Sequence, residues 1–326
     1  MKRGQLQTGI GAALGMMVLI LDGKTALAGA REGIELCLVS VIPSLFPFFV
    51  LSMLITNSFS GAELPLLRPL GKLFSLPKGG ESLLVPAFLG GYPVGARCVS
   101  DAWRGGKLET AQAQRMLAFC SNAGPAFLFG MAGQMFPEKW MAWALWGIHI
   151  AGAWTVSALL PCNTASMKGQ TGKEPSPSSL MSAAVTVMLQ VCGWVVLFRV
   201  VLAFLNRWIL WLLPVAGQVA LTGFLELSNG CCNLMRIEDV SLRFMVCSGI
   251  LAWGGLCVTM QTASVCQGLS MKYYFLGKAM QTVLSLLFSA AVAAGYYVLI
   301  PLVLVTAGII RWKKRKNSSI FVPAGV

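Results

Sequence analysis

Long apolar runs recur along this chain, and short polar segments separate them. The runs that read as membrane spans lie at residues 6–21, 37–55, 116–135, 140–160, 182–205, 244–261 and 275–312. An α-helix rises about 1.5 Å per residue, so about 20 apolar residues cross the ~30 Å hydrocarbon core of a bilayer. The last run is long enough for two helices that turn near Gly295. The pattern therefore predicts an all-α polytopic membrane protein with about eight transmembrane helices.

Two further apolar segments are interrupted near their middle. They cover residues 83–99 and 209–234, and glycine, proline or polar residues break each of them. The halves of a broken segment are too short to cross a bilayer as helices. Backbone polar groups at membrane depth must be covered by protein or by water, so such breaks favour segments that turn back inside the protein. We therefore expect two re-entrant hairpins.

The same order of segments occurs twice: a span, an interrupted hairpin, a broken span and another span. Each half would cross the membrane three times, an odd number, so the two halves would be inverted relative to each other. Inverted repeats with discontinuous helices are typical of secondary transporters. The expected domains are an N-terminal transmembrane helix with an interfacial helix (1–36), a first repeat (37–162), a polar cytoplasmic linker (163–179), a second repeat (180–294), and a last transmembrane helix with a basic cytoplasmic tail (295–326).

The composition agrees with a membrane protein. Hydrophobic residues make up 56% and charged residues 11% of the 326 residues, whereas charged residues make up about 25% of an ordinary soluble domain. The mean hydropathy is +0.72. The catalytic signatures G-x-S-x-G and H-E-x-x-H and the phosphate-binding P-loop do not occur. We therefore expect a membrane protein that is not an enzyme.

The formal net charge of +13 arises from 25 basic and 12 acidic residues. The basic residues lie mainly in short segments between the apolar runs, whereas nucleic-acid-binding proteins gather them on one wet face. With both termini inside, most of the basic residues fall on the cytoplasmic side, Lys278 and the tail at 311–316 among them, as the positive-inside rule requires. We therefore expect a multi-pass protein of the cell membrane, with cytoplasmic N- and C-termini and no nucleic-acid partner.

Ten cysteines occur, most of them inside apolar runs, and no two of them form a C-x-x-C pair. Only one histidine, His149, is available to join them. A zinc site needs closer thiolate and imidazole spacing, and a free cysteine packs as a small hydrophobe. We therefore expect no metal and no cofactor. His149 lies on an apolar helix, where it serves either as a buried packing residue or as a proton relay.

The breaks in the apolar segments are the candidate substrate site. Free N–H groups at the start of a half-helix favour anions, and free carbonyls favour cations. The first break holds Gly91, Tyr92, Pro93 and Gly95, and Arg97 follows it. Glycines let a backbone approach a ligand closely, and an arginine can bind a carboxylate with two parallel hydrogen bonds. The alternative is a tight turn followed by an arginine on the cytoplasmic surface.

The second break holds Ser121, Asn122, Gly124 and Pro125. Serine and asparagine side chains at a break can bind a ligand, or alternatively they can cap the ends of the broken helix. A fourth break, at residues 252–255, occupies the corresponding place in the second half. Two breaks in each half therefore contribute to the predicted site.

The third break contains Glu226, the only acidic residue that we place at membrane depth. It is followed by Ser228, Asn229 and Gly230. Carboxylates inside a membrane are costly and usually functional. Glu226 could therefore carry a coupling proton or coordinate a sodium ion. The alternative is a structural partner for a basic residue such as Arg199 or Arg236.

At these breaks the chain resembles a known family. Residues 45–49 (LFPFF), 90–96 (GGYPVGA), 120–127 (CSNAGPAF) and 225–230 (LELSNG) are similar to segments of the YlbJ-type sporulation integral membrane proteins. That family is grouped with the nucleoside-recognition or Gate domains, which also occur in ferrous iron transporter B and in the concentrative nucleoside transporters. The resemblance implies two Gate-like repeats in a spore-associated membrane protein. Members of the stage V type are associated with moving dipicolinate into the developing spore.

Three functions are compatible with this reading. The leading hypothesis is a secondary transporter of a small organic anion, with dipicolinate, a planar dianion, as the substrate that the resemblance implies. Its expected partners are the lipid bilayer, the anion, a coupling ion (proton or sodium) and further copies of the same chain, and the resemblance implies the forespore membrane as its location. The alternatives are a nucleoside or cation permease of the same fold, and a membrane subunit that assembles spore or envelope proteins without transporting a solute.

Overall fold

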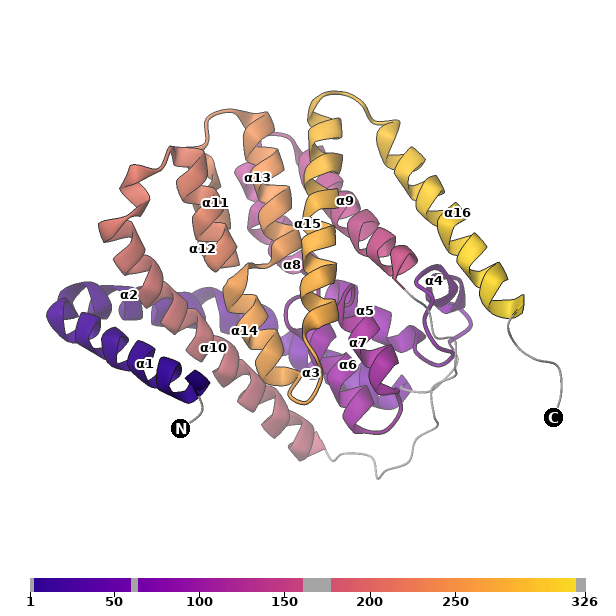
Figure 1. Cartoon of the computed structure of the whole chain (residues 1–326), viewed down its shortest axis with the longest axis horizontal. Helices are drawn as coiled ribbons and strands as arrows, with labels where there is room; N and C mark the ends of the chain where they lie inside the picture. Colours follow the sequence, from indigo (N-terminus) through magenta and orange to yellow (C-terminus); the bar gives the residue numbers. More distant parts are fainter. Residues whose placement is uncertain (1–2, 60–63, 161–176, 321–326) are drawn as a thin grey trace.

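The computed structural model describes residues 3–59, 64–160 and 177–320, and over these ranges it contains helices and no strands (Figure 1). Most of the expected linker at 163–179 lies outside the described residues. Four helices are long and apolar enough to cross a membrane, or five when the bent pair Gly9–Leu21 and Gly23–Val41 is taken as one span. The all-α polytopic membrane fold is thus confirmed, whereas the count of eight crossings stays a prediction.

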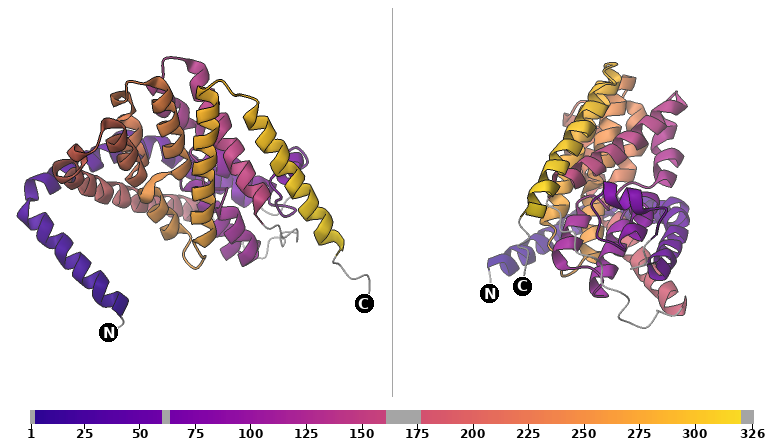
Figure 2. Two further views of the ribbon diagram at one scale, coloured as in Figure 1. Left: turned by 45° about the horizontal axis from the view of Figure 1, so that its top comes forward. Right: turned by 90° about the vertical axis from the view of Figure 1, so that its right-hand side faces the viewer.

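The N-terminal part consists of α1 (Arg3–Leu21), α2 (Gly23–Leu36) and α3 (Ile42–Phe59). Asp22 separates the first two helices. Its side chain accepts a hydrogen bond from the backbone N–H of Thr25 (3.2 Å) and thereby caps α2. The chain bends by 100° at this point, and α1 projects away from the other helices (Figure 2).

No break in the backbone helix separates α2 from α3, and the domain boundary expected after residue 36 stays a prediction. A π-helical turn, Cys37–Val41, joins the two helices into one rod. The first part of this rod packs along α10 (Pro177–Trp208). Two glycines make the close approach possible, because a Cβ on Gly29 would lie 2.9 Å from the Val200 Cα, and one on Gly33 would meet the same helix. Small residues commonly let two membrane helices approach in this way.

The remaining helices of each half include a hairpin, a broken helix and a long helix, in that order. Their assignment to two inverted repeats stays a prediction. In the first half, the helices after the rod are α4 (Arg68–Leu73), α5 (Leu84–Leu89), α6 (Val94–Arg104), α7 (Thr110–Leu117), α8 (Pro125–Gly130) and α9 (Lys139–Leu159). In the second half, the helices after α10 are α11 (Val215–Leu225), α12 (Leu227–Cys232), α13 (Val240–Trp253), α14 (Gly255–Val265), α15 (Lys272–Ala293) and α16 (Leu299–Ile320). The hairpins are α5–α6 and α11–α12, and the broken helices are α7–α8 and α13–α14.

The last apolar run forms two helices, α15 and α16, as its length suggested. Gly295 lies in the turn between them with a φ of +78°, a conformation that favours glycine. The turn therefore falls at the glycine that the sequence indicated.

The two halves interlock instead of forming separate bodies. Helix α15 of the second half packs against α9 and α7 of the first half as well as against α13 of its own (Figure 1). Helix α13 also contacts α9, and α14 contacts α6. Residues from both halves therefore reach the centre of the molecule.

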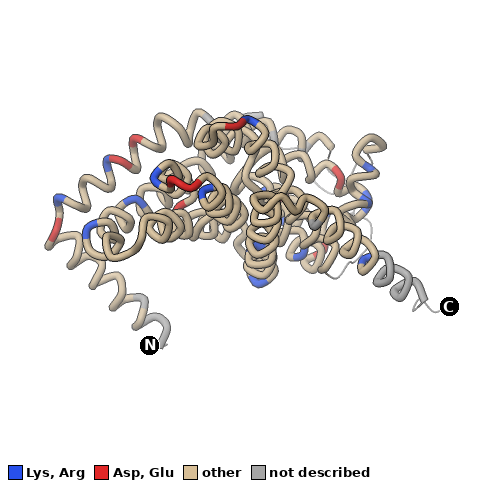
Figure 3. Tube along the Cα trace, turned by 90° about the horizontal axis from the view of Figure 1, so that it is seen from above, with Lys and Arg blue, Asp and Glu red and all other residues tan. Residues whose placement is uncertain are grey.

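The described surface has the character expected next to lipid. Charged residues are sparse along most of the trace (Figure 3). Large apolar side chains are exposed on α1, α10 and α15; examples are Ile20 (77% exposed), Leu189 (67%) and Leu287 (61%). In water such surfaces would be costly, whereas in a bilayer they face hydrocarbon chains.

Candidate functional site

A cleft lies where the interrupted segments meet. Apolar side chains of the α2–α3 rod and of α10, such as Leu45, Phe48 and Val191, form one part of its lining. The remaining part includes residues of the first three breaks, namely Gly91, Tyr92, Gly124, Glu226 and Ser228. The cleft therefore joins three of the four breaks to an apolar helical wall.

Within each half, the tip of the hairpin touches the break in the following helix. Gly91 has a φ of +79° and lies against Gly124, where an added Cβ would be 3.0 Å from the Gly91 nitrogen. In the second half, Gly255 has a φ of +87°, and a Cβ on it would lie 3.1 Å from the Leu227 nitrogen. Glycine at these contacts lets two backbones meet without an intervening side chain.

Tyr92 connects the two halves. Its hydroxyl donates a hydrogen bond to the carbonyl oxygen of Leu251 in α13 (3.1 Å). Its ring lies against Gly254, where an added Cβ would be 3.1 Å from the Tyr92 Cζ. The first break thus contacts the fourth, and all four breaks meet around this buried tyrosine.

Lys278 of α15 lies directly behind Tyr92 and is 1% exposed. Its Nζ donates to the Tyr92 hydroxyl (2.8 Å), the Ala252 carbonyl (3.2 Å) and the Gln281 Oε1 (3.0 Å). The same nitrogen lies 4.8 Å from the centre of the Tyr92 ring. None of the ion pairs in the described part of the chain involves Lys278. A buried ammonium group therefore sits at the meeting point of the breaks with only neutral acceptors.

Gln281 extends this network to the second break. Its Nε2 donates to the Asn122 Oδ1 (3.1 Å) and to the His149 carbonyl (3.1 Å). The Asn122 Nδ2 in turn donates to the carbonyls of Ala87 (3.3 Å) and Phe119 (2.7 Å). The Asn122 amide thus ties the first hairpin, the second break and α15 together.

His149 supports the second break through its ring. Its Nε2 accepts a hydrogen bond from the backbone N–H of Ala123 (3.1 Å), so this nitrogen carries no proton. The residue is 2% exposed. The contact matches the packing and hydrogen-bonding role that the sequence left open beside a proton relay.

Glu226 caps the half-helix α12. Its carboxylate accepts hydrogen bonds from the backbone N–H groups of Ser228 (2.9 Å) and Asn229 (2.6 Å). Arg199, which was considered as a partner, instead lies 3.9 Å from Glu32. Glu226 is the only Asp, Glu, Lys or Arg among the described residues that line the cleft. A resident negative charge therefore occupies the start of this half-helix.

Comparison with known proteins bears on the resemblance at the breaks. No family model matches the chain, and no solved structure matches it. The sporulation integral membrane protein YlbJ of Bacillus subtilis is 24% identical over an alignment that covers 83% of this chain and 78% of that protein. The resemblance to the YlbJ-type proteins is confirmed. It covers far more of the chain than the short motifs at the breaks.

In this YlbJ-like chain, the predicted site residues divide into two groups. Those that line the cleft are Gly91, Tyr92, Gly124, Glu226 and Ser228. Those that do not line it are Pro93, Gly95, Arg97, Ser121, Asn122, Pro125, Asn229 and Gly230.

Most of the second group shape the breaks. Gly95 packs against Ala87, where a Cβ on Gly95 would lie 2.8 Å from the Ala87 Cα, and Gly230 packs in the same way against Gly223. Pro125 is the first residue of α8, a position where its missing N–H costs nothing. These residues determine where the cleft lies without lining it.

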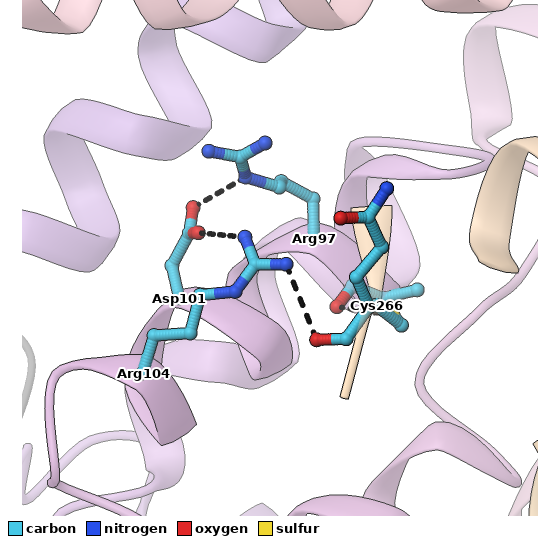
Figure 4. Close-up of polar contacts among 6 residues, drawn as sticks. Arg97, Asp101, Arg104 and Cys266 are labelled. Atoms are coloured by element: carbon cyan, nitrogen blue, oxygen red, sulfur yellow. Dashed lines mark hydrogen bonds and ion pairs between the residues drawn. The ribbon is translucent and has the colours of Figure 1, made fainter. Parts of the chain in front are cut away.

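Arg97 lies outside the cleft, so the structure does not place it where it was predicted to bind a carboxylate. Its Nε donates to the Asp101 Oδ2 at 2.7 Å, one helical turn along α6 (Figure 4). Arg104 approaches the same carboxylate (4.0 Å) and donates to the Gln267 carbonyl (3.4 Å). Partial burial raises the pKa of Asp101, and the two guanidinium groups oppose that rise. The positive charge of Arg97, which we expected to bind the substrate, is therefore engaged in an ion pair with Asp101.

The sequence reading missed Lys278, which it placed on the cytoplasmic side. The positive-inside rule suggested that assignment, because the residue lies near the start of the apolar run at 275–312. Apolar residues flank Lys278 on both sides, and Gln281 follows three positions later on the same helix face. These two polar side chains on one face of an apolar helix were the signal in the sequence that Lys278 points into the protein.

The described residues hold no group of three or more His, Cys, Asp or Glu side chains that could bind a metal. The described cysteines are free, and most of them are buried; Cys120 and Cys247 are both fully covered. Cys162 lies outside the described residues. These thiols pack as small apolar side chains.

Proposed function

We propose that this protein is a secondary transporter that carries a small organic anion across a bacterial membrane, with dipicolinate during sporulation as the specific candidate. The observation that carries the proposal is the meeting of four helix breaks, two from each half, beside one cleft. Breaks of this kind bring backbone groups within reach of a solute at membrane depth. Secondary transporters bind their substrates and coupling ions at such places.

The connection between the halves suits alternating access, in which one repeat moves against the other around a central site. Tyr92 links the halves by side-chain hydrogen bonds to Leu251 and Lys278. A hydrogen bond of this kind contributes about 0.5–1.5 kcal/mol net, or more with a charged donor. Movement of one half against the other would also have to rearrange the Gln281–Asn122 hydrogen bond and the packing of α15 on α7 and α9.

The sporulation part of the proposal rests on similarity. The relative that covers most of the chain is named as a sporulation integral membrane protein. The resemblance at the breaks implies the stage V type, which is associated with dipicolinate. The ammonium of Lys278 directly behind the lining supports an anion over a cation, because a buried positive charge attracts negative solutes.

Glu226 favours a second candidate, a nucleoside or cation permease of the same fold. Its carboxylate lines the cleft, and two backbone N–H groups hold it in place. A carboxylate inside a membrane commonly binds a cation or carries a proton. Under the first proposal Glu226 carries the coupling ion; under the second it contacts the substrate itself.

Ligand-dependent thermal stabilisation of the detergent-purified protein distinguishes the two candidates. A ligand that binds only the folded state stabilises it, by about 2.7 kcal/mol at a hundred times its Kd. We expect dipicolinate to raise the unfolding temperature and nucleosides or sodium alone not to do so. Uptake of dipicolinate by liposomes that contain the protein then tests transport. Stabilisation by nucleosides without any effect of dipicolinate would favour the permease, and a protein that binds none of these solutes would contradict both.

A further inference from the structure

The position of Lys278 leads beyond the general proposal of an anion transporter. The side chain is 1% exposed and belongs to α15, one of the helices long enough to span a membrane. Ionisable residues at membrane depth are costly and mostly pair with one another. In the described part of the chain, however, Lys278 takes part in no ion pair. Its positive charge has solvating neighbours but no counter-charge.

The three neighbours account for every proton of the ammonium group. Two of them are the Ala252 carbonyl (3.2 Å) and Gln281 (3.0 Å), which belong to the second half. The third is the Tyr92 hydroxyl of the first half (2.8 Å). Removing an ion's partner in an apolar interior is strongly unfavourable. Among the described residues Lys278 has no carboxylate partner, so we do not expect this lysine to serve stability alone.

Tyr92 separates this charge from the cleft. It is one of the residues that line the cleft, and its ring lies 4.8 Å from the Lys278 Nζ. No lysine or arginine is among the described residues of the lining. Tyr92 therefore provides a hydrogen-bonded route from the cleft to a positive charge.

We propose that Lys278 is the counter-ion for a carboxylate of the substrate, and that Tyr92 shields it while the cleft is empty. This inference rests on the proposed transport of an organic anion and names the residue that selects for negative charge. A shift of the Tyr92 side chain exchanges its hydroxyl for a carboxylate oxygen on the ammonium. The same shift breaks the bond from Tyr92 to Leu251, so binding of the anion loosens the contact between the halves.

The test compares two ligands that differ in charge but hardly in shape: dipicolinate and its neutral diamide, pyridine-2,6-dicarboxamide. Binding of each to the full-length purified protein is measured for the wild type, Lys278→Gln and Lys278→Arg. Lys272→Gln is the matched control, because Lys272 lies on the same helix but is exposed. A purely structural role of Lys278 would weaken both ligands alike, so the preference for the acid over the diamide is the decisive quantity.

We expect the wild type and Lys272→Gln to prefer the acid, and Lys278→Gln to lose about ten- to a hundredfold of that preference, the value of a charged hydrogen bond. Lys278→Arg should retain most of it. A wild type that binds the acid, together with a Lys278→Gln variant of unchanged preference, would overturn this inference and leave the proposed function intact. A wild type that binds no anion would overturn both.

Tyr92→Phe provides a second measurement that does not depend on the folding of Lys278→Gln. The phenyl ring can pack on Gly254 but makes neither the bond to the ammonium nor the bond to Leu251, so the ring shifts more easily when an anion binds. We expect the preference for dipicolinate over the diamide to rise in this variant. A fall to equal binding of the two ligands would contradict the shielding role of Tyr92 and with it the proposed position of the counter-ion.

Discussion

Gly91 and Gly124 hold the first two breaks against each other, because a Cβ at either position would press on the backbone of the other glycine. A Cβ on Gly91 would lie 3.3 Å from the Gly124 nitrogen, and one on Gly124 would lie 3.0 Å from the Gly91 Cα. Gly91 also has a φ of +79°, which other residues adopt only with strain. The shape of the cleft at this point therefore depends on two glycines.

We expect Gly91→Ala and Gly124→Ala each to lower the free energy of unfolding by about 1–3 kcal/mol, the usual cost of backbone strain or of a forced displacement. Both should also weaken stabilisation by dipicolinate. The measurement is thermal unfolding in detergent with and without the ligand. Gly147→Ala in α9 is the control, since a Cβ there meets nothing within 4 Å and alanine favours helix. Wild-type unfolding of Gly124→Ala would contradict the close contact.

The Asn122–Gln281 hydrogen bond couples the second break to α15. Asn122 uses both of its donors on carbonyls and its oxygen on the Gln281 Nε2 at 3.1 Å. A double-mutant cycle of Asn122→Ala and Gln281→Ala should therefore give an interaction energy of about 0.5–3 kcal/mol. Gln134→Ala replaces Gln281→Ala in the control cycle, because the Gln134 side chain bonds an exposed carbonyl elsewhere. Additive effects of the first pair would show that the bond contributes nothing.

Glu226→Gln separates the capping role of this residue from a role in transport. The change removes one of two acceptors and the negative charge at the start of α12, so we expect a loss of stability of about 1 kcal/mol. If Glu226 also carries the coupling ion, uptake into liposomes should fall much more than ligand binding does. Asp239→Asn is matched to it, because Asp239 caps α13 through the Leu242 N–H on the exposed side. Equal uptake by Glu226→Gln and Asp239→Asn would show that Glu226 serves only as a helix cap.

Arg97→Gln should leave binding of dipicolinate unchanged. Arg97 pairs with Asp101 at 2.7 Å and does not line the cleft. A partly exposed ion pair of this type contributes at most about 1 kcal/mol. The measurement compares the affinity of purified Arg97→Gln for dipicolinate with that of Lys278→Gln. Loss of binding in Arg97→Gln alone would restore the role that the sequence first suggested for this arginine.

The helix breaks could be predicted from the sequence, because glycines clustered with proline or polar residues inside an apolar run disfavour a continuous helix. Single residues do not suffice, since Pro47 and Gly147 lie inside helices. Gly124, Pro125 and Gly255 all lie at such points in the structure. The meeting of the breaks could not be predicted. It depends on packing between segments that are distant along the chain, such as the contact of Tyr92 with Leu251.

Charge was the least reliable guide to the site. Arg97 has the chemistry to bind a carboxylate, but Asp101 lies one helical turn away and takes up the same guanidinium group. From the sequence, a lysine near the start of an apolar run looks the same whether its side chain points into water, as expected for Lys278, or into the protein. Only the tertiary structure, which packs α15 of the second half against α7 and α9 of the first, decides between these orientations.

The order of Lys278 and its partners along the chain has a consequence for biosynthesis. A lysine in a helix that leaves the translocon alone costs about 2.5–3.5 kcal/mol at the bilayer centre. Tyr92 and Ala252 both precede Lys278 in the sequence, and Gln281 lies in the same helix. When α15 enters the membrane, every acceptor for its ammonium group has therefore already been synthesised or arrives with it. Insertion of this helix and closure of the central network can accordingly occur as one step, with the earlier helices acting as the receiving surface.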